Sequence, residues 1–376
     1  MAEHEQIELY KQRSNNCIVI DHIDDDDSHC SNFDMQKSGY AVIDENHPDV
    51  DLWLQEIDGL SLNTVVSSAA FMEKLPQNYI PVIPRHSGVI LSKYEPPYIA
   101  VRLSDVVSQV NLNVIGSLER FKTSPDTKVI LLCYGKDKLI EDIWPVRHLI
   151  FPEIAKLGFA AVTSVNYSVW DEQPHLERAI NVKRSLKTYE EMQKIGIPVV
   201  PHMYWLGYKS LDNWLYWLSA NKQVNTLAIC MQTLRSKKDW QRAIKELTYF
   251  TENLERPIHF LITGASKPAR IKQLKEIMPQ MTLTNGSASR LALAHQSIME
   301  YGTGTAQYVD QDRSVTFEHN VEHFQKHMGC LDNKQELIVS TNPGYKITQN
   351  IVLNKPAKIS TGKYGKILRE DLVQRE

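Results

Sequence analysis

The chain has few cysteines and no long apolar run. Its five cysteines are odd in number, widely spaced and without a Cys-x-x-Cys pair: Cys17, Cys30, Cys133, Cys230 and Cys330. We therefore expect no disulfide framework and a reducing, cytoplasmic location. No apolar stretch approaches the roughly 18 residues that a membrane-spanning helix needs. Residues 1–13 are polar and acidic and lack the apolar centre of a secretory signal.

The charge of the chain is distributed unevenly. Hydrophobic residues make up 42% and charged residues 23% of the 376 residues, which is typical of a globular protein with a large core. Residues 1–60 hold 15 Asp or Glu against 3 Lys or Arg, a net charge of −12, whereas residues 345–376 hold 7 basic and 3 acidic residues, a net charge of +4. The head and the tail either attract each other, or the basic part faces a polyanion, or both are solvated surfaces.

From Pro97 onward, short β-rich runs alternate with longer amphipathic runs. The expected strands are 98–103, 128–134, 159–164, 197–203, 224–230, 258–263, 280–284 and, more weakly, 306–309. The expected helices are 105–122, 139–157, 176–195, 212–221, 238–254, 267–277 and 287–301. Most of the strand runs are apolar throughout, which indicates a parallel sheet covered by helices on both faces. The pattern predicts a parallel (βα)8 TIM-like barrel, with an open doubly wound sheet as the alternative.

Four regions follow from this pattern. Residues 1–60 form an acidic, partly disordered head, and residues 61–96 form a proline-rich wrapping segment. The βα-barrel occupies residues 97–310. Residues 311–376 form a small basic extension, with a helix at 317–329 and a basic tail behind it.

Polar and aromatic side chains gather in the loops that follow the expected strands, where a parallel barrel binds its ligands. In chain order the main candidates are Lys136, Asp137, Asn166, Ser168, His202, Tyr204, Trp205, Gln232, Thr263, Gly264, Asn285 and Ser287. Arg102, Tyr134 and Thr284 also end expected strands. A pocket that combines polar atoms and flat rings suits a planar, hydrogen-bonding ligand such as a nucleobase. The alternative is that these residues solvate the strand ends.

Roles can be assigned to most of these residues. His202 is the candidate acid or base because an imidazole titrates near neutrality, and Asp137 is its candidate carboxylate partner. Asn166 and Gln232 are expected to read a base. Tyr204 and Trp205 offer stacking surfaces, and Lys136 a phosphate contact.

Two glycine-bearing turns, 263–267 and 284–289, precede helices and offer backbone N–H groups to a phosphate. The second turn is better placed, because phosphate sites in barrels tend to follow the last strands. Neither turn fits a P-loop or a G-x-G-x-x-G fingerprint, so capping turns are the alternative interpretation.

Three histidines, His319, His323 and His327, are spaced four residues apart on one expected helix, which would let them share a zinc ion. The apolar stripe of that helix instead places them on its opposite, solvent-facing side. No cofactor is predicted, and zinc is a weak candidate only.

Three sequence blocks, at 165–170, 181–185 and 196–205, resemble an uncharacterised βα-barrel family found in bacteria, phages and mobile elements. More distantly, the arrangement is similar to the barrel of tRNA-guanine transglycosylases. Gln232 and the Thr263–Gly264 turn fall where that resemblance implies that a base is held. Two features depart from those enzymes: residues 284–287 contain no carboxylate, and the zinc-binding cysteine cluster is missing.

The chain is therefore expected to bind a nucleobase or nucleotide, free or within nucleic acid, at the carboxyl ends of its strands. If it is an enzyme, it would modify a base or act on a glycosidic bond. The alternative is a non-catalytic adaptor or DNA-associated protein of a phage, plasmid or mobile element, which would dock partners through the acidic head and the basic tail. No membrane partner is expected, and the pattern does not indicate an oligomeric state.

Overall fold

The computed structural model describes residues 50–62, 75–76, 78–85, 88–91, 94–121, 124–169, 173–234, 236–299 and 305–333. The chain divides into two compact units, Met1–Leu337 and Ile338–Glu376. The second unit lies outside the described residues, and so does most of the predicted acidic head. The basic tail is therefore not described.

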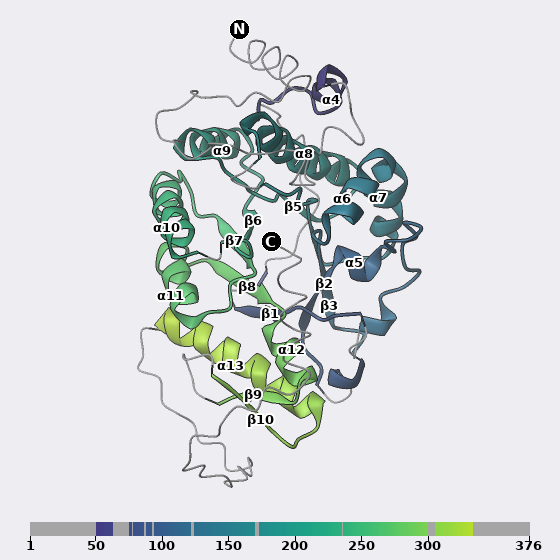
Figure 1. Ribbon diagram of the computed structural model, residues 1–376, viewed down its shortest axis with the longest axis vertical. Helices are drawn as coiled ribbons and strands as arrows, with labels where there is room; N and C mark the ends of the chain where they lie inside the picture. Colours follow the sequence, from purple (N-terminus) through teal and green to yellow (C-terminus); the bar gives the residue numbers. More distant parts are fainter. Residues whose placement is uncertain are drawn as a thin grey trace, which may run out of the picture. The chain divides into compact units, whose positions relative to one another are not determined.

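The first unit contains two four-stranded parallel sheets (Figure 1). One sheet has the order β1 (Tyr79–Pro81), β8 (Met281–Asn285), β7 (His259–Thr263) and β6 (Thr226–Cys230). The other has the order β2 (Tyr98–Arg102), β3 (Lys128–Leu132), β4 (Ala161–Thr163) and β5 (Val199–Val200). Every pairing within these two sheets is parallel. The prediction of an α/β fold with parallel strands is confirmed.

The two sheets contact each other at both of their edges. Val82, just after β1, forms a parallel bridge to Ala100 of β2, and the Ile83 N–H donates to the Ala100 carbonyl at 2.8 Å. On the other side, His202, just after β5, forms a parallel bridge to Ala228 of β6. There the Met203 N–H donates to the Ala228 carbonyl at 2.8 Å.

The helices that follow the strands lie around the outside of the sheets (Figure 1). They are α6 (Asp137–Ile143), α7 (Arg147–Lys156), α8 (His175–Lys194), α9 (Tyr208–Ala220), α10 (Lys237–Glu252), α11 (Pro268–Ile277) and α12 (Ser287–Leu293). Helix α10 shows how the sequence specifies one of them. Ser236 caps its first turn by accepting the Asp239 N–H, and Trp240, Ala243 and Leu247 recur at helical spacing and are buried.

Two clusters of apolar residues form the core. The large one lies between the strands and the helices. The small one, which we call the inner cluster, takes residues from both sheets: Leu75, Ile80, Val82, Ala100, Ile130, Leu132, Ala161, Val200, Ala228 and Leu261. We call the sheet face that carries it the inner face. The strands are apolar on both faces because each face contributes to one of these two clusters.

All eight expected runs contain a strand, but only seven of these strands belong to the two parallel sheets. Strand β10 (Ala306–Tyr308) pairs antiparallel with β9 (Gln296–Ile298), outside the two parallel sheets. The remaining parallel strand is β1, within the segment that was expected to wrap around the barrel. Prolines argue against a strand there. The hydrogen bonds to β8 avoid Pro81: the Leu283 N–H donates to Asn78 and the Val82 N–H donates to Asn285.

Three helix predictions need correction. The expected helix 105–122 is reduced to α5 (Leu103–Val106) and a 3-10 turn, η2 (Glu119–Phe121). The expected helix 139–157 is interrupted by η3 (Trp144–Val146), where Pro145 removes a backbone donor. The expected helix 287–301 ends with α12, and β9 follows it.

Helix α13 (Arg313–Asn333) contacts β1, β9 and α12, so residues 313–333 belong to the same fold. Its Phe324 ring stacks on Tyr79 of β1 with 4.5 Å between the centroids. Among the helices that the structure describes, none combines the length and the apolar character needed to cross a bilayer.

Candidate functional site

A layer of polar side chains lies at the carboxyl ends of the strands on the inner face. Alternate residues of a strand point to the same side. Four residues each lie two positions after an inner-cluster residue along the chain: Tyr134, His202, Cys230 and Thr263. A fifth, Thr284, pairs with the inner-cluster residue Ile80 on the neighbouring strand. We call these five residues the polar layer. It contains two residues from the predicted site, His202 and Thr263.

Three members of the polar layer, Tyr134, Cys230 and Thr263, interact with one another. Burial raises the pKa of Tyr134 well above its usual value, the neighbouring Cys230 adds to the rise, and the Thr263 hydroxyl offsets part of it. Burial also raises the pKa of the Cys230 thiol, and Thr263 again opposes the rise. Tyr134, Cys230 and Thr263 are therefore neighbours, and both the phenol and the thiol are neutral near pH 7.

His202 is the most unusual member of the layer. Its side chain is buried, with 1% exposure, and neither ring nitrogen has a hydrogen-bond partner among the described residues. Burial lowers the pKa of His202 to about 3, so the imidazole is neutral near pH 7. The Thr284 hydroxyl is also buried without a described partner. Leaving a buried polar group unpaired costs about 1–3 kcal/mol, so such groups call for an explanation.

Outside the polar layer, Asp137 at the start of α6 meets Ser168 in the loop after β4. The Ser168 hydroxyl donates to Asp137 at 2.5 Å, and the Asn181 side chain of α8 donates to the Ser168 carbonyl at 2.8 Å. Among the described contacts, no hydrogen bond or ion pair joins Asp137 to His202, so their predicted partnership is not direct. Lys136 is exposed, and Asn166 is half-buried with its N–H bonded to the Cys133 carbonyl.

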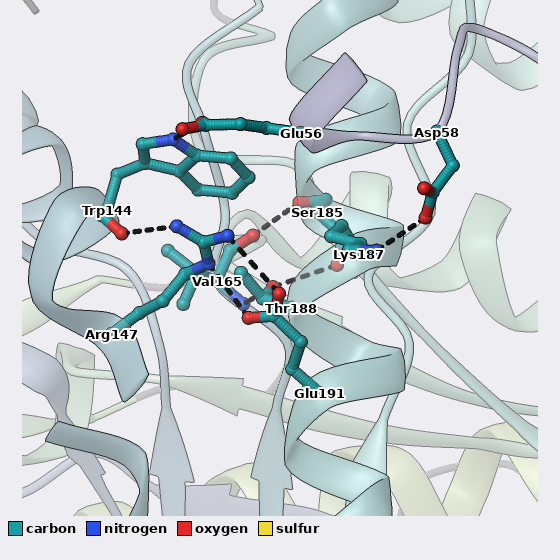
Figure 2. Close-up of polar contacts among 9 residues, drawn as sticks. All are labelled: Glu56, Asp58, Trp144, Arg147, Val165, Ser185, Lys187, Thr188 and Glu191. Atoms are coloured by element: carbon teal, nitrogen blue, oxygen red, sulfur yellow. Dashed lines mark hydrogen bonds and ion pairs between the residues drawn. The ribbon is translucent and has the colours of Figure 1, made fainter. Parts of the chain in front are cut away.

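Helix α8 holds the backbone that leads into these loops (Figure 2). The Val165 N–H donates to the Thr188 hydroxyl at 3.1 Å, and the Ser185 hydroxyl donates to the Val165 carbonyl. The backbone N–H and carbonyl of Val165, two residues after β4, are thus both bonded to side chains of α8. The loop that carries Asn166 and Ser168 is therefore positioned by a rigid element.

Tyr204 and Trp205 have their polar ends bonded to the protein. The Tyr204 hydroxyl donates to the Val169 carbonyl at 3.0 Å, and the Trp205 indole donates to Glu246 of α10 at 2.7 Å. Both rings are half-buried against the large core cluster. They fasten the loop after β5 to its neighbours, and stacking on a ligand stays a prediction.

The turn after β6 touches the turn after β7. Gly264 has a φ of +82°, and a Cβ built on it would lie 2.8 Å from both Cβ and N of Gln232. The Gly264 N–H donates to the Thr284 carbonyl at 3.1 Å. The fold therefore brings together Gln232, Thr263 and Gly264, as the sequence predicts, but the Gly264 N–H already has a partner.

The turn after β8 is also occupied by protein contacts. The Asn285 side chain accepts the Ser287 N–H at 2.9 Å and donates to the Ala265 carbonyl at 2.8 Å. It also accepts the Tyr79 hydroxyl at 3.2 Å. These bonds favour the capping-turn interpretation of Asn285 and Ser287 over the phosphate site.

The prediction that His319, His323 and His327 face solvent is wrong for His327, and the other two are half-buried. His327 is 7% exposed, and the His319 ring lies 3.1 Å from the Ile298 carbonyl of β9. Strand β9, which was not predicted, covers part of this side of α13. Within the described ranges, no group of three or more His, Cys, Asp or Glu is arranged to hold a metal ion.

The histidines of α13 make stability depend on pH. Burial, together with the charges of His319, His327 and Lys326, lowers the pKa of His323 to about 4, and burial also lowers the pKa of His327. An unfolded histidine has a pKa of about 6.5, so protons bind the unfolded chain first as pH falls. We expect stability to be fully present above about pH 6.5 and to fall by about 1–3 kcal/mol towards pH 4. Urea unfolding at several pH values across this range measures the free energy of unfolding. The prediction would be contradicted if His323→Gln showed the same dependence of that free energy on pH as the wild type.

Sequence comparisons do not identify the protein. The chain matches no protein-family model, and no curated protein matches it. The resemblance of the three blocks at 165–205 to a barrel family and to transglycosylases therefore stays a prediction.

One residue of the polar layer, Cys230, was not among the strand-end candidates predicted from the sequence. It joins the polar layer through strand register, which requires the strand bounds to be correct within one residue. Counting alternate positions along the apolar run 226–230 would have found it.

Proposed function

We propose that the two sheets close into one eight-stranded parallel βα-barrel and that its polar layer binds a nucleobase or a nucleotide. The bridges at both sheet edges and the inner cluster, which draws on both sheets, support closure. In such barrels the ligand site lies at the carboxyl ends of the strands, where the polar layer is found.

The observation that carries the proposal is the unpartnered imidazole of His202. A neutral imidazole offers one hydrogen-bond donor and one acceptor, which match the paired acceptor and donor on the edge of a nucleobase. The Thr284 hydroxyl supplies a further donor and acceptor on the same face. A bound base would satisfy polar groups that the protein itself leaves unpaired.

Catalysis at this site would modify the base or act on its glycosidic bond. Several titratable groups with shifted pKa values lie together there, which is typical of active sites. Because His202 stays neutral, its role is to hold the base or a shared proton without carrying a charge. The alternative, a non-catalytic adaptor, depends on the acidic head and basic tail, which lie mostly outside the described residues.

Replacing His202 by leucine tests the proposal. We expect nucleotide binding to be lost while the free energy of unfolding stays the same or rises by about 1 kcal/mol, since an unpaired polar group is replaced by an apolar one of similar size. Calorimetric titration with the common nucleosides and 5′-monophosphates, together with urea unfolding, measures both quantities.

His148→Leu is the matched control, because His148 is exposed on α7. It should leave binding unchanged. Wild-type binding by His202→Leu would contradict the proposal. A loss of more than about 2 kcal/mol in stability would also contradict it, since it would show that the imidazole serves the fold.

A further inference from the structure

Three arginines gather around one buried carboxylate after β1 and β2. Asp105 of α5 is 6% exposed. Its carboxylate accepts the Arg85 N–H at 3.1 Å and both the N–H and the Nε of Arg102 at 3.3 Å. The Arg120 guanidinium donates to the Asp105 carbonyl at 2.6 Å. We call Arg85, Arg102 and Arg120 the arginine cluster.

The cluster carries more positive charge than its surroundings balance. Of the three guanidinium groups, that of Arg102 pairs with the Asp105 carboxylate, and in the described part of the chain the Arg85 side chain has no ion-pair partner. Burial, together with the charge of Arg85, lowers the pKa of Arg120, so these two cations lie close enough to repel each other. All three side chains still reach solvent. Repelling cations that are open to solvent favour an incoming anion.

The cluster adjoins the polar layer. Arg102 pairs with Leu132 of the inner cluster, so its side chain lies on the inner face. Its charge also lowers the pKa of Tyr134, which places the guanidinium near that hydroxyl. A ligand in the polar layer could therefore contact the arginines at the same time.

We infer that the arginine cluster binds the phosphate group of a nucleotide whose base occupies the polar layer. The inference rests on the proposed function and deepens it, because it selects a nucleotide over a free base. Guanidinium groups bind phosphate oxygens through paired, charge-assisted hydrogen bonds. In the two glycine turns after β7 and β8, the N–H groups of Gly264 and Ser287 are bonded to the protein and are not offered to the phosphate.

Arg85→Met provides the test. The Arg85 bond to Asp105 comes from its main chain, so the substitution removes charge without removing that bond. We expect nucleoside 5′-monophosphates to bind about tenfold or more weakly to the variant, and nucleosides to bind as they do to wild type. Lys272→Met, which removes one exposed charge on α11, should change neither affinity.

Titrations with ribose 5-phosphate and inorganic phosphate separate the outcomes. If wild type binds a nucleoside and its 5′-monophosphate equally well, or if Arg85→Met changes neither affinity, the phosphate site is overturned and the base site stands. If phosphate and ribose 5-phosphate bind in an Arg85-dependent manner but nucleosides do not bind, the base site is overturned and the anion site stands. If none of the probes binds, both are overturned.

Discussion

Replacing Arg184 by methionine is expected to lower the free energy of unfolding by about 3–5 kcal/mol. Arg184 of α8 is fully buried, and its guanidinium donates to both carboxylate oxygens of Glu141, at 3.1 and 2.7 Å. It also donates to Asn181 at 3.1 Å. Removing the cation leaves the half-buried Glu141 carboxylate without its partner, which is why breaking such a pair costs more than the pair contributes. Urea unfolding measures the change.

Aromatic rings enclose the same guanidinium. Its central carbon lies 3.7 Å from the ring centre of Tyr167, 4.6 Å from Trp144 and 4.7 Å from Trp53. Trp53 belongs to α4 (Val50–Glu56), so the cation also joins an N-terminal helix to α8. Lysine should not restore stability, because it lacks the planar fork that meets two carboxylate oxygens and stacks on rings.

Arg147→Met is the matched control, because it breaks another ion pair between an arginine and a glutamate that involves α8. Arg147 of α7 bonds Glu191 of α8 at 2.8 Å, but both side chains are partly exposed, at 15% and 27% (Figure 2). We expect it to cost about 1 kcal/mol. In a double-mutant cycle, Glu141→Gln should be nearly harmless once Arg184 is gone. Equal losses of unfolding free energy in Arg184→Met and Arg147→Met would contradict the larger role given to the buried Arg184–Glu141 pair.

The strands could be predicted from the sequence wherever the run was apolar throughout. The strands at 128–132 and 259–263 are buried on both faces, which their largely apolar composition indicates. Strand β1 could not be predicted, because it is three residues long and ends in Pro81. The arginine cluster was missed for the same reason, since Arg85 meets Arg102 only when β1 is placed beside β2.

Helix α8 shows what a hydrophobic pattern cannot report. Its bounds were predicted closely, yet it buries Glu177, Asn181, Lys183 and Arg184. A polar sequence normally indicates a solvated face. Here it reflects partners far away in the chain. Arg184 pairs with Glu141, 43 residues before it. The Lys183 ammonium donates at 2.7 Å to the carbonyl of Ser61, 122 residues before it. Local spacing carries no information about such pairs.

Gly264→Ala is expected to lower the free energy of unfolding by about 2–5 kcal/mol. A positive φ costs a residue with a Cβ about 1–2 kcal/mol, and a clash in a packed region adds about 1–3 kcal/mol. At Gly264 both apply, because φ is +82° and the added Cβ would lie 2.8 Å from the Gln232 nitrogen and 2.9 Å from its Cα. Thermal and urea unfolding measure the loss.

Gly196→Ala separates the two causes. Gly196 has the same φ of +82°, but a Cβ there would have no neighbour within 4 Å. It should therefore show the backbone cost alone, about 1–2 kcal/mol. The additional loss of unfolding free energy in Gly264→Ala is attributed to the contact with Gln232. Because two of the contacting atoms belong to the Gln232 backbone, Gln232→Ala should not restore stability to Gly264→Ala. Rescue by Gln232→Ala would show that the side chain, and not the close approach of two strand-end turns, makes glycine necessary there.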